Sequence, residues 1–227
     1  MTRVVVFAAV DLEARSLARL LGLARVARSE WPHYRMGALE LVCVGPRARA
    51  LDARAPRVAP PAFVVSAGVC GALSPDLAEG DLVVPETVVG ATGARYATAE
   101  VGGLRRSGTL VTVDDVVATP RAKARLWVEA GALACDMESA TILEWARARA
   151  IPAAVIRAVS DTAQRGVPAD LAAVVEPDGR VRTIRAVRAM LARPRAFADA
   201  LALRSGTNAA LRAVAHALGQ VARRGVE

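Results

Sequence analysis

The sequence predicts a three-layer α/β domain, with helices on both faces of a central sheet. Short apolar runs without polar alternation, such as residues 4–10 and 153–159, indicate strands buried on both faces. Segments with apolar residues at helical spacing lie between such runs, as at residues 136–149. Strands that alternate with helices are typical of this architecture. No repeat or long linker divides the 227 residues, so we expect one domain over residues 1–227.

The first part of the chain starts with the strand at residues 4–10, and Asp11 follows as the predicted N-cap of a leucine-containing helix. Residues 45–61 are rich in Pro, Arg and Ala, and we expect a loop or a short helix there. A buried strand at residues 63–66 should end in a glycine-containing turn at residues 67–71.

The remaining elements follow from the same signals. We expect further strands at residues 39–44, 81–89 and 110–113. Thr119 and Pro120 predict a helix start that runs to about Gly131. Residues 166–227 are mostly helical in pattern, with a turn at Pro177-Asp178-Gly179.

The net charge of +8 raises the question of nucleic-acid binding. The arginines are scattered along the chain, and aromatic residues, which would stack on bases, make up only 4%. We therefore favour a solvated basic surface and expect no nucleic-acid partner.

The cysteines and histidines define no metal site or disulfide framework. Cys43, Cys70 and Cys135 are isolated in apolar stretches, and His33 and His216 have no metal-ligand spacing around them. The apolar run at the N-terminus is too short for a membrane span and is followed at once by acidic residues. We expect a reducing, cytoplasmic location and no metal or organic cofactor.

Four segments place polar or small residues where a ligand would bind. In such sheets ligands bind at the carboxyl ends of strands. The acidic residues of these segments also have purely structural interpretations. Asp161 could cap a turn, Asp136 and Glu138 could be first-turn acids of a helix, and Glu13 could be a solvent-facing helical residue. The segments are Asp11-Leu12-Glu13, Ser66 to Gly71, Cys135 to Ser139, and Ser160-Asp161.

Their order along the chain resembles the purine nucleoside phosphorylase and nucleosidase superfamily. The resemblance covers residues 4–162 and consists of the glycine-containing GVCGAL segment, the GDLVVP strand start, the acidic-Met-Glu-Ser segment CDMES, and a strand that ends in Ser-Asp. It implies the nucleoside phosphorylase type of α/β/α fold with a mixed central sheet. It also implies an enzyme that cleaves the N-glycosidic bond of a purine nucleoside and that forms a homodimer, as members of the family usually form dimers or larger assemblies.

Glu13 indicates the branch within this superfamily. Residues 8–13 resemble the N-terminal motif of methylthioadenosine/S-adenosylhomocysteine nucleosidases, in which the matching glutamate polarises the attacking water. Ser66 lies where the hexameric phosphorylases have a phosphate-binding arginine, and Val69 lies where they have a serine. Losing a cation and a hydroxyl donor weakens a phosphate site, so hydrolysis is favoured over phosphorolysis. Val69 also departs from the serine of the nucleosidases.

The resemblance implies a role for each site residue. Asp161 is the general acid that protonates N7 of the base, and burial at a strand end would favour its protonated form. Glu13 activates water, Glu138 accepts hydrogen bonds from the ribose diol, and Ser160 orients Asp161. The other expected substrate contacts are Met137 on the sugar face, Gly68 and Val69 beside the sugar, and Val117 or its neighbour Val116 over the base.

A second resemblance concerns the C-terminal part. Residues 160–168, the Pro177-Asp178-Gly179 turn and Arg193-Pro194 are similar to hopanoid-associated members of the superfamily. Those members imply adenosylhopane, a membrane-associated lipid, as substrate. Two alternatives stay open: a phosphorylase that uses phosphate as co-substrate, and a non-catalytic nucleoside- or nucleic-acid-binding protein.

Overall fold

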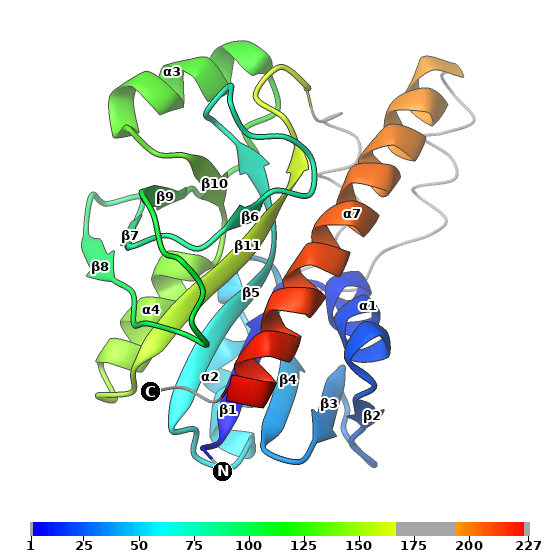
Figure 1. Ribbon diagram of the computed structural model, residues 1–227, viewed down its shortest axis with the longest axis vertical. Coiled ribbons are helices and arrows are strands. Elements are labelled where there is room, and N and C mark those ends of the chain that lie inside the picture. The colour runs from blue at the N-terminus through cyan, green and yellow to red at the C-terminus, as the bar shows by residue number, and fades with distance from the viewer. Residues whose placement is uncertain (1, 167–193, 225–227) are drawn as a thin grey trace.

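The strands form one mixed sheet in the computed structural model, which describes residues 2–166 and 194–224 (Figure 1). One strand, β11 (Ala153–Asp161), pairs with β5 and with β6 (Leu82–Val83). The other strands lie side by side in the order β2 (Ala24–Arg25), β3 (His33–Met36), β4 (Leu39–Cys43), β1 (Val4–Ala8), β5 (Phe63–Ala72), β10 (Ala134–Asp136), β9 (Thr109–Thr112), β7 (Thr87–Val89) and β8 (Arg95–Ala97).

Strand β5 connects the two halves of the sheet. It runs parallel to β1 and to β11 and antiparallel to β10. The predicted mixed sheet is therefore confirmed. Because β1, β5 and β11 are parallel, their carboxyl ends meet at one edge of the sheet, where ligands bind in folds of this kind.

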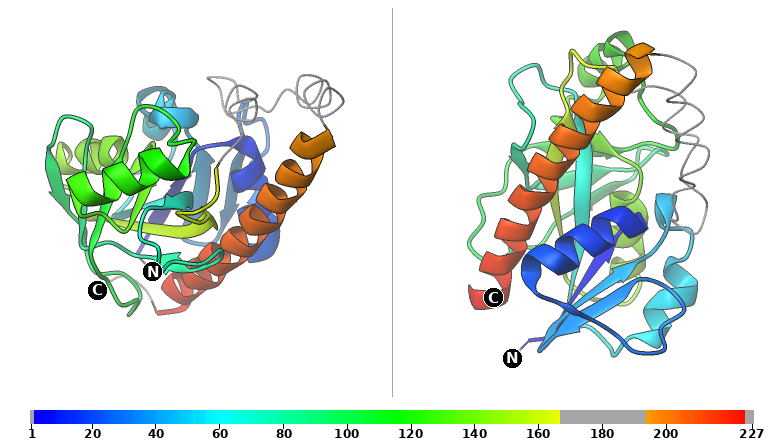
Figure 2. Two further views of the ribbon diagram at one scale, coloured as in Figure 1. Left: turned by 90° about the horizontal axis from the view of Figure 1, so that it is seen from above. Right: turned by 90° about the vertical axis from the view of Figure 1, so that its right-hand side faces the viewer.

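Helices cover both faces of the sheet, which confirms the three-layer architecture (Figure 2). Alternate residues of β1 enter different cores: Val4 and Val6 pack with one set of helices, and Val5 and Phe7 with the other. The first core contains residues of α1 (Asp11–Leu21) and α7 (Pro194–Arg224). The second contains residues of α2 (Leu51–Arg54), α4 (Ser139–Arg147) and the 3-10 turns η1 (Pro46–Ala48) and η2 (Ala55–Arg57).

Helix α3 (Pro120–Ala130) has the ends that the sequence predicts. Thr119 caps its N-terminus by accepting a hydrogen bond from the Ala122 N–H at 3.2 Å, and Pro120 is the first helical residue. Gly131 ends the helix in a left-handed conformation, φ 58°. The short helices between residues 45 and 61 agree with the prediction for that segment.

Several strand predictions were wrong. Gly68 and Gly71 do not form a turn, because β5 continues through them to Ala72 while β11 pairs along its length. Residues 81–89 form two short strands, β6 and β7, rather than one. Strands β2, β3, β8 and β10 were not predicted, since they are short or carry mixed polar and apolar residues.

Two helix starts also differ from the prediction. Val10 is the N-cap of α1, and Asp11 is its first helical residue. Helix α4 begins at Ser139 rather than at residue 136, because Asp136 belongs to β10 and Glu138 is the N-cap position. Asp136 and Glu138 are therefore not first-turn helix acids.

The predicted turn at residues 177–179 and Arg193 lie outside the described residues. The long helix α7 agrees with the helical pattern expected for the C-terminal part. Within the described ranges, none of the helices combines the length and the apolar character needed to cross a bilayer.

Candidate active site

Glu13 is held at the start of α1, just beyond the end of β1. Its side chain is buried, with the residue 4% exposed. Its Oε2 accepts a hydrogen bond from the Val10 N–H at 3.2 Å, the reciprocal half of a capping box. Its Oε1 accepts one from the Val69 N–H at 3.0 Å. The carboxylate is thus fixed against β5, and each oxygen has lone-pair capacity for a further donor such as water.

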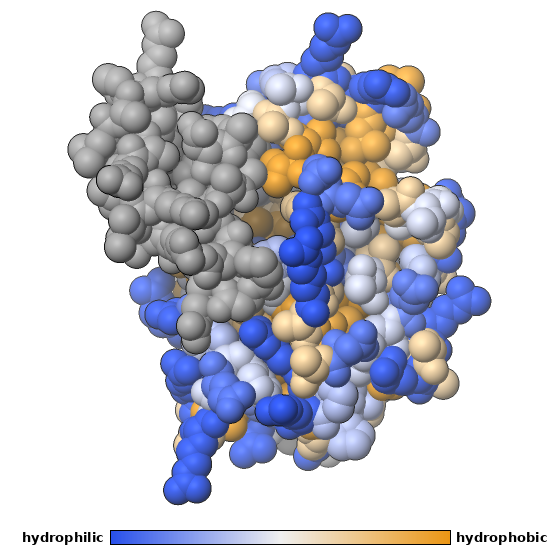
Figure 3. Space-filling view, turned by 180° about the vertical axis from the view of Figure 1, so that it is seen from behind, coloured by the Kyte–Doolittle hydropathy of each residue, from blue (hydrophilic) through white to orange (hydrophobic). Residues whose placement is uncertain are grey.

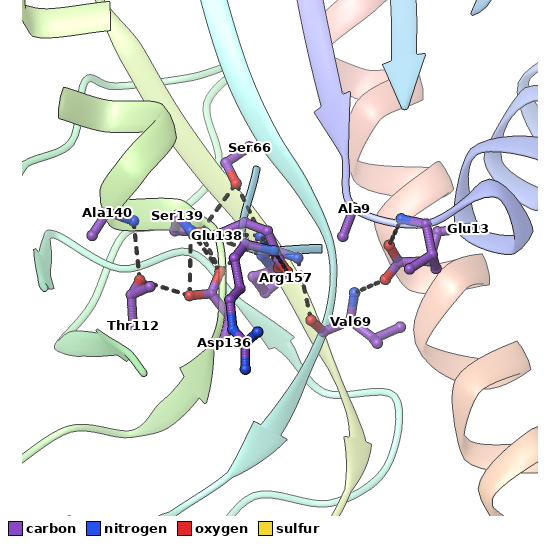
Figure 4. A network of polar contacts seen from close by, with 12 residues as sticks. Ala9, Glu13, Ser66, Val69, Thr112, Asp136, Glu138, Ser139, Ala140 and Arg157 are labelled. Atoms are coloured by element: carbon purple, nitrogen blue, oxygen red, sulfur yellow. Dashed lines mark hydrogen bonds and ion pairs between the residues drawn. The ribbon is translucent and has the colours of Figure 1, made fainter. Parts of the chain in front are cut away.

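Gly68 and Val69 on β5 join Glu13 to Arg157. A Cβ atom at Gly68 would lie 2.8 Å from Glu13 Oε1 and 2.6 Å from Arg157 Nη1, so only glycine allows both groups to approach the strand. The Val69 carbonyl accepts a hydrogen bond from Arg157 Nη1 at 3.3 Å, while its N–H donates to Glu13 (Figure 4). The predicted substrate contacts of Gly68 and Val69 stay predictions.

Arg157 is the centre of a buried polar cluster and was not among the predicted site residues. It lies on β11, and its side chain is 1% exposed. Its Nη2 is 2.7 Å from Asp136 Oδ2 and 3.5 Å from Glu138 Oε2, and it donates to Ser66 Oγ at 3.0 Å. A buried guanidinium needs such partners, because an unpaired buried charge is strongly destabilising.

Asp136 anchors this cluster at the end of β10. Its Oδ1 accepts a hydrogen bond from Thr112 Oγ1 at 2.7 Å, and its Oδ2 accepts one from Ser139 Oγ at 2.5 Å. The Ala140 N–H donates in turn to Thr112 Oγ1 at 3.0 Å, which ties the start of α4 to β9. Both carboxylate oxygens of Asp136 thus already accept hydrogen bonds, which is consistent with a positioning role.

Glu138 is the acid of the cluster that has the fewest partners. It is 6% exposed, and its Oε1 accepts a hydrogen bond from the Arg47 N–H at 3.0 Å. Burial raises the pKa of Glu138 to about 7, and the charges of Asp136 and Glu13 act in the same direction, while Arg157 and the Arg47 N–H oppose them. Glu138 can therefore gain or lose a proton near neutral pH.

Asp161 ends β11 and is 5% exposed. Its Oδ1 accepts a hydrogen bond from Ser160 Oγ at 2.7 Å, and the same hydroxyl lies 3.2 Å from the Cys70 carbonyl oxygen. A Cβ atom at Gly71 would lie 3.1 Å from Asp161 Oδ2, so the glycine leaves room for the carboxyl group beside β5. Ser160 thus lies where it can orient Asp161.

Lys123 of α3 forms an ion pair with the other oxygen of Asp161, Oδ2. Its ammonium also donates to the carbonyl oxygens of Thr162 at 2.7 Å and Arg165 at 3.0 Å. The burial expected for Asp161 is present, and a buried cation lies beside its carboxyl group. Lys123 was not predicted as a site residue, and it is the only lysine in the sequence.

The residues predicted to cover the sugar and the base are less constrained. Met137 is partly buried and lies directly between Asp136 and Glu138. Val117 is partly buried against a small core that includes Leu73 and Val111. Val116 is 38% exposed. Their roles toward a substrate stay predictions.

The predicted residues fall into two groups on the paired strands β5 and β11. Glu138 forms an ion pair with Arg157, and the charge of Glu13 acts on the same guanidinium. Ser160 and Asp161 lie three and four residues beyond Arg157 on β11, at the edge of the sheet. Arg157 could have been found as the one charged residue inside the apolar run at residues 153–159. Lys123 could have been found as a lysine in a chain whose other basic residues are all arginines.

A family model described as the phosphorylase superfamily matches residues 99–192. Over this segment, which is less than half of the 227 residues, the chain is similar to the phosphorylase superfamily. No curated protein matches the sequence.

Solved nucleosidases and a related hydrolase have the same fold. The 5′-methylthioadenosine nucleosidase of Arabidopsis thaliana has a TM-score of 0.69 and 18% identity, covering 98% of this chain and 95% of that one. The futalosine hydrolase of Helicobacter pylori has a TM-score of 0.69 and 15% identity, covering 98% and 97%. The 5′-methylthioadenosine/S-adenosylhomocysteine nucleosidase of Helicobacter pylori has a TM-score of 0.70 and 15% identity, covering 98% of each chain.

Proposed function

We propose that this protein hydrolyses the N-glycosidic bond of a purine nucleoside, with adenine as the preferred base. One observation carries the proposal: three buried acids from three different elements, Glu13, Glu138 and Asp161, are held along the paired strands β5 and β11. Two of them share the buried cation Arg157. The fold shared with solved nucleosidases supports a nucleoside as the substrate.

Each acid has a task in this reaction. Glu13 takes a proton from water as the water attacks the anomeric carbon, Glu138 accepts hydrogen bonds from the ribose 2′- and 3′-hydroxyls, and Asp161 protonates N7 as the base leaves. Ser160 orients Asp161, and Arg157 holds Glu138 and the Val69 backbone in place. Met137 covers the sugar and Val117 covers the base.

The charge balance around Arg157 favours water over phosphate as the nucleophile. Asp136, Glu138 and Glu13 all act electrostatically on this single guanidinium, and Asp136 is only 2.7 Å from it. Arg47, another arginine of the described residues near this cluster, directs its side chain to Asp115 at 2.7 Å. Counted over the described residues around Arg157, carboxylates outnumber cations, so phosphate binding is disfavoured.

The substrate test is a panel of purine nucleosides, assayed for released base with and without phosphate. Methylthioadenosine, S-adenosylhomocysteine, adenosylhopane and futalosine cover the range of 5′ substituents, and inosine tests the preference for adenine. We expect release of adenine without phosphate. Release only with phosphate would identify a phosphorylase, and tight binding without turnover would identify a binding protein.

Asp161→Asn should lower the rate of adenine release by at least about 100-fold, because the amide cannot act as a general acid. The exposed Asp52→Asn, on α2, is the matched control and should keep the wild-type rate. An Asp161→Asn rate close to that of the wild type would remove Asp161 from the proposed role.

Glu13→Gln should abolish hydrolysis while leaving nucleoside binding largely intact, because the amide keeps the shape but cannot take a proton from water. Glu129→Gln, on the exposed side of α3, is the control. The nucleophile assignment fails if phosphate-dependent cleavage survives in Glu13→Gln.

We also propose a homodimer in a reducing cytoplasm. The support for a dimer is apolar surface at the end of the molecule that carries α3, at the upper right of Figure 3. Trp127 and Val128 of α3 are 39% and 79% exposed. The support for a reducing compartment is that all three cysteines are free. Light scattering in solution tests the dimer.

A further inference from the structure

The contacts of Lys123 go beyond those of a structural ion pair. Its three ammonium hydrogens have three acceptors: Asp161 Oδ2 and the carbonyl oxygens of Thr162 and Arg165. The residue is 1% exposed. The fork of an arginine could not point three donors at acceptors grouped around one nitrogen, whereas a compact ammonium can. This accounts for a single lysine in a chain that otherwise uses arginine.

Both oxygens of Asp161 are thereby held from different elements. Lys123 on α3 contacts Oδ2, and Ser160 on β11 donates to Oδ1 at 2.7 Å. The side chains of Lys123 and Asp161 are 1% and 8% exposed, so water screens their interaction little. The orientation of the carboxyl group therefore depends on α3, 38 residues away in the sequence.

In the part of the chain that the structure describes, the other titratable groups around Asp161 are thiols with a raised pKa or a carboxylate that is already paired. The thiols of Cys70 on β5 and Cys135 on β10 lie near it, and burial raises the pKa of both, that of Cys135 to about 12. Asp136 on β10 is engaged by Arg157 at 2.7 Å. Among the described residues around this carboxyl group, Lys123 is thus the cation that contacts it.

We propose that Lys123 is a positioning residue that orients Asp161 and sets the strength of this group as an acid. A buried carboxyl group without a cation nearby holds its proton tightly and is a weak donor. Beside an ammonium group the carboxyl group releases its proton more readily, which speeds proton transfer to the departing base. The same effect lowers the pH above which the carboxyl group has already lost its proton and can no longer act as an acid.

Because this role rests on the proposed function, the main test is the pH dependence of base release by the full chain. In Lys123→Met the alkaline limb of kcat/KM should move upward by about one pH unit or more, as for loss of an opposite charge within contact distance. The maximal rate should fall by roughly 10-fold or more, because the acid is weaker. Lys123→Arg keeps the charge but not the three-acceptor geometry, so its alkaline limb should stay closer to that of the wild type than the limb of Lys123→Met does.

A second readout does not require turnover. Glu138 contributes the same band to both proteins, so the readout is a difference spectrum: Lys123→Met minus the double variant Lys123→Met/Asp161→Asn should show the infrared absorption of a protonated buried carboxyl group at neutral pH. If Lys123→Met does not fold, Lys123→Gln replaces it with the same expectations.

The inference would be overturned if the alkaline limb of kcat/KM in Lys123→Met stayed at its wild-type pH. It would also be overturned if the limb in Lys123→Arg moved as far as it does in Lys123→Met. Absence of the infrared band from the difference spectrum would overturn it as well. Failure of the wild type to release any base would instead refute the proposed function, and the infrared comparison would then test the Lys123–Asp161 pair alone.

Discussion

The pKa of Glu138 lies close to neutral pH, at about 7. Burial is the largest cause of its raised pKa, and the neighbouring acids Asp136 and Glu13 add to it. The ionised form is the better acceptor for a ribose diol, since a carboxylate accepts stronger hydrogen bonds than a neutral acid. In the proposed reaction, the site combines an acid that must release a proton, Asp161, with one that binds best after losing its proton, Glu138.

The first prediction at this scale concerns substrate binding. The Kd for a purine nucleoside should decrease as pH rises through about 7, because Glu138 becomes charged over that range. Glu138→Gln has no charge to gain, so it should bind the nucleoside with a higher Kd that lacks this pH dependence. Calorimetric titration at several pH values measures both. Equal pH dependence in the two proteins would exclude Glu138 as the titrating group.

The same pKa makes a prediction for stability. The folded-state pKa of Glu138 is raised from 4.5 to about 7, so the folded protein binds a proton over this range that the unfolded chain does not. The contribution to stability is complete below pH 4.5 and is lost as pH rises to about 7. The free energy of unfolding of the wild type, measured relative to Glu138→Gln with urea, should therefore fall over this window.

At the scale of elements, short connections place the acids. The turn at Pro46–Ala48 brings Arg47 against the N-cap of α4, where its N–H donates to Glu138 Oε1. Arg47 has a left-handed conformation, φ 56° and ψ 24°, which is unusual for a residue with a side chain. The backbone of this turn, rather than the arginine side chain, contacts the proposed sugar-binding acid.

Arg47→Pro should therefore be far more harmful than Arg47→Gly. Proline lacks the N–H and cannot adopt positive φ, so loss of a hydrogen bond to a charged group should raise the nucleoside Kd by about 10-fold or more. Glycine keeps the N–H and the backbone conformation, and loses only contacts to Asp114 and to the exposed Asp115. If Arg47→Gly loses affinity to the same extent, the side chain rather than the backbone is responsible.

Helix α7 supports the end of β11 through a close contact. A Cβ atom at Gly206 would collide with the Ser160 carbonyl oxygen and lie 2.9 Å from the Cδ of Glu79. At Gly219 on the same helix, a Cβ atom would meet only Arg223 Nη1 at 3.4 Å and a methyl group of Leu21 at 3.9 Å. The first glycine is required by packing, and the second is not.

Alanine at these two glycines should change stability in opposite directions. Gly206→Ala should destabilise the protein by about 1–3 kcal/mol, as overpacking does. Gly219→Ala should stabilise it by about 0.5–1 kcal/mol, because alanine has the higher helix propensity. Urea unfolding of the two variants measures the difference, and the same sign for both would contradict the packing described here.

For the whole molecule, the sequence was sufficient to predict the layers but not all of the site. Apolar runs reveal β1, β4 and β11, because strands buried on both faces need continuous apolar side chains. Glu13, Glu138 and Asp161 could be selected because a family resemblance added to the weak local signals.

Long-range contacts account for most of what was missed. Lys123 meets Asp161 across 38 residues, and Arg47 meets Glu138 across 91, so no local pattern reveals either pair. The extent of β5 was underestimated because its glycines are typical of turns, whereas here they make space for the side chains of Glu13, Arg157 and Asp161.

The origin of the oxygen that replaces the base tests the central claim most directly. Methylthioadenosine, or whichever nucleoside of the panel is turned over, is cleaved in ¹⁸O-labelled water with and without phosphate, and the sugar product is analysed by mass spectrometry. Hydrolysis predicts one ¹⁸O atom bound to the anomeric carbon and a rate that does not depend on phosphate. A sugar 1-phosphate as product, or cleavage only when phosphate is added, would contradict the account.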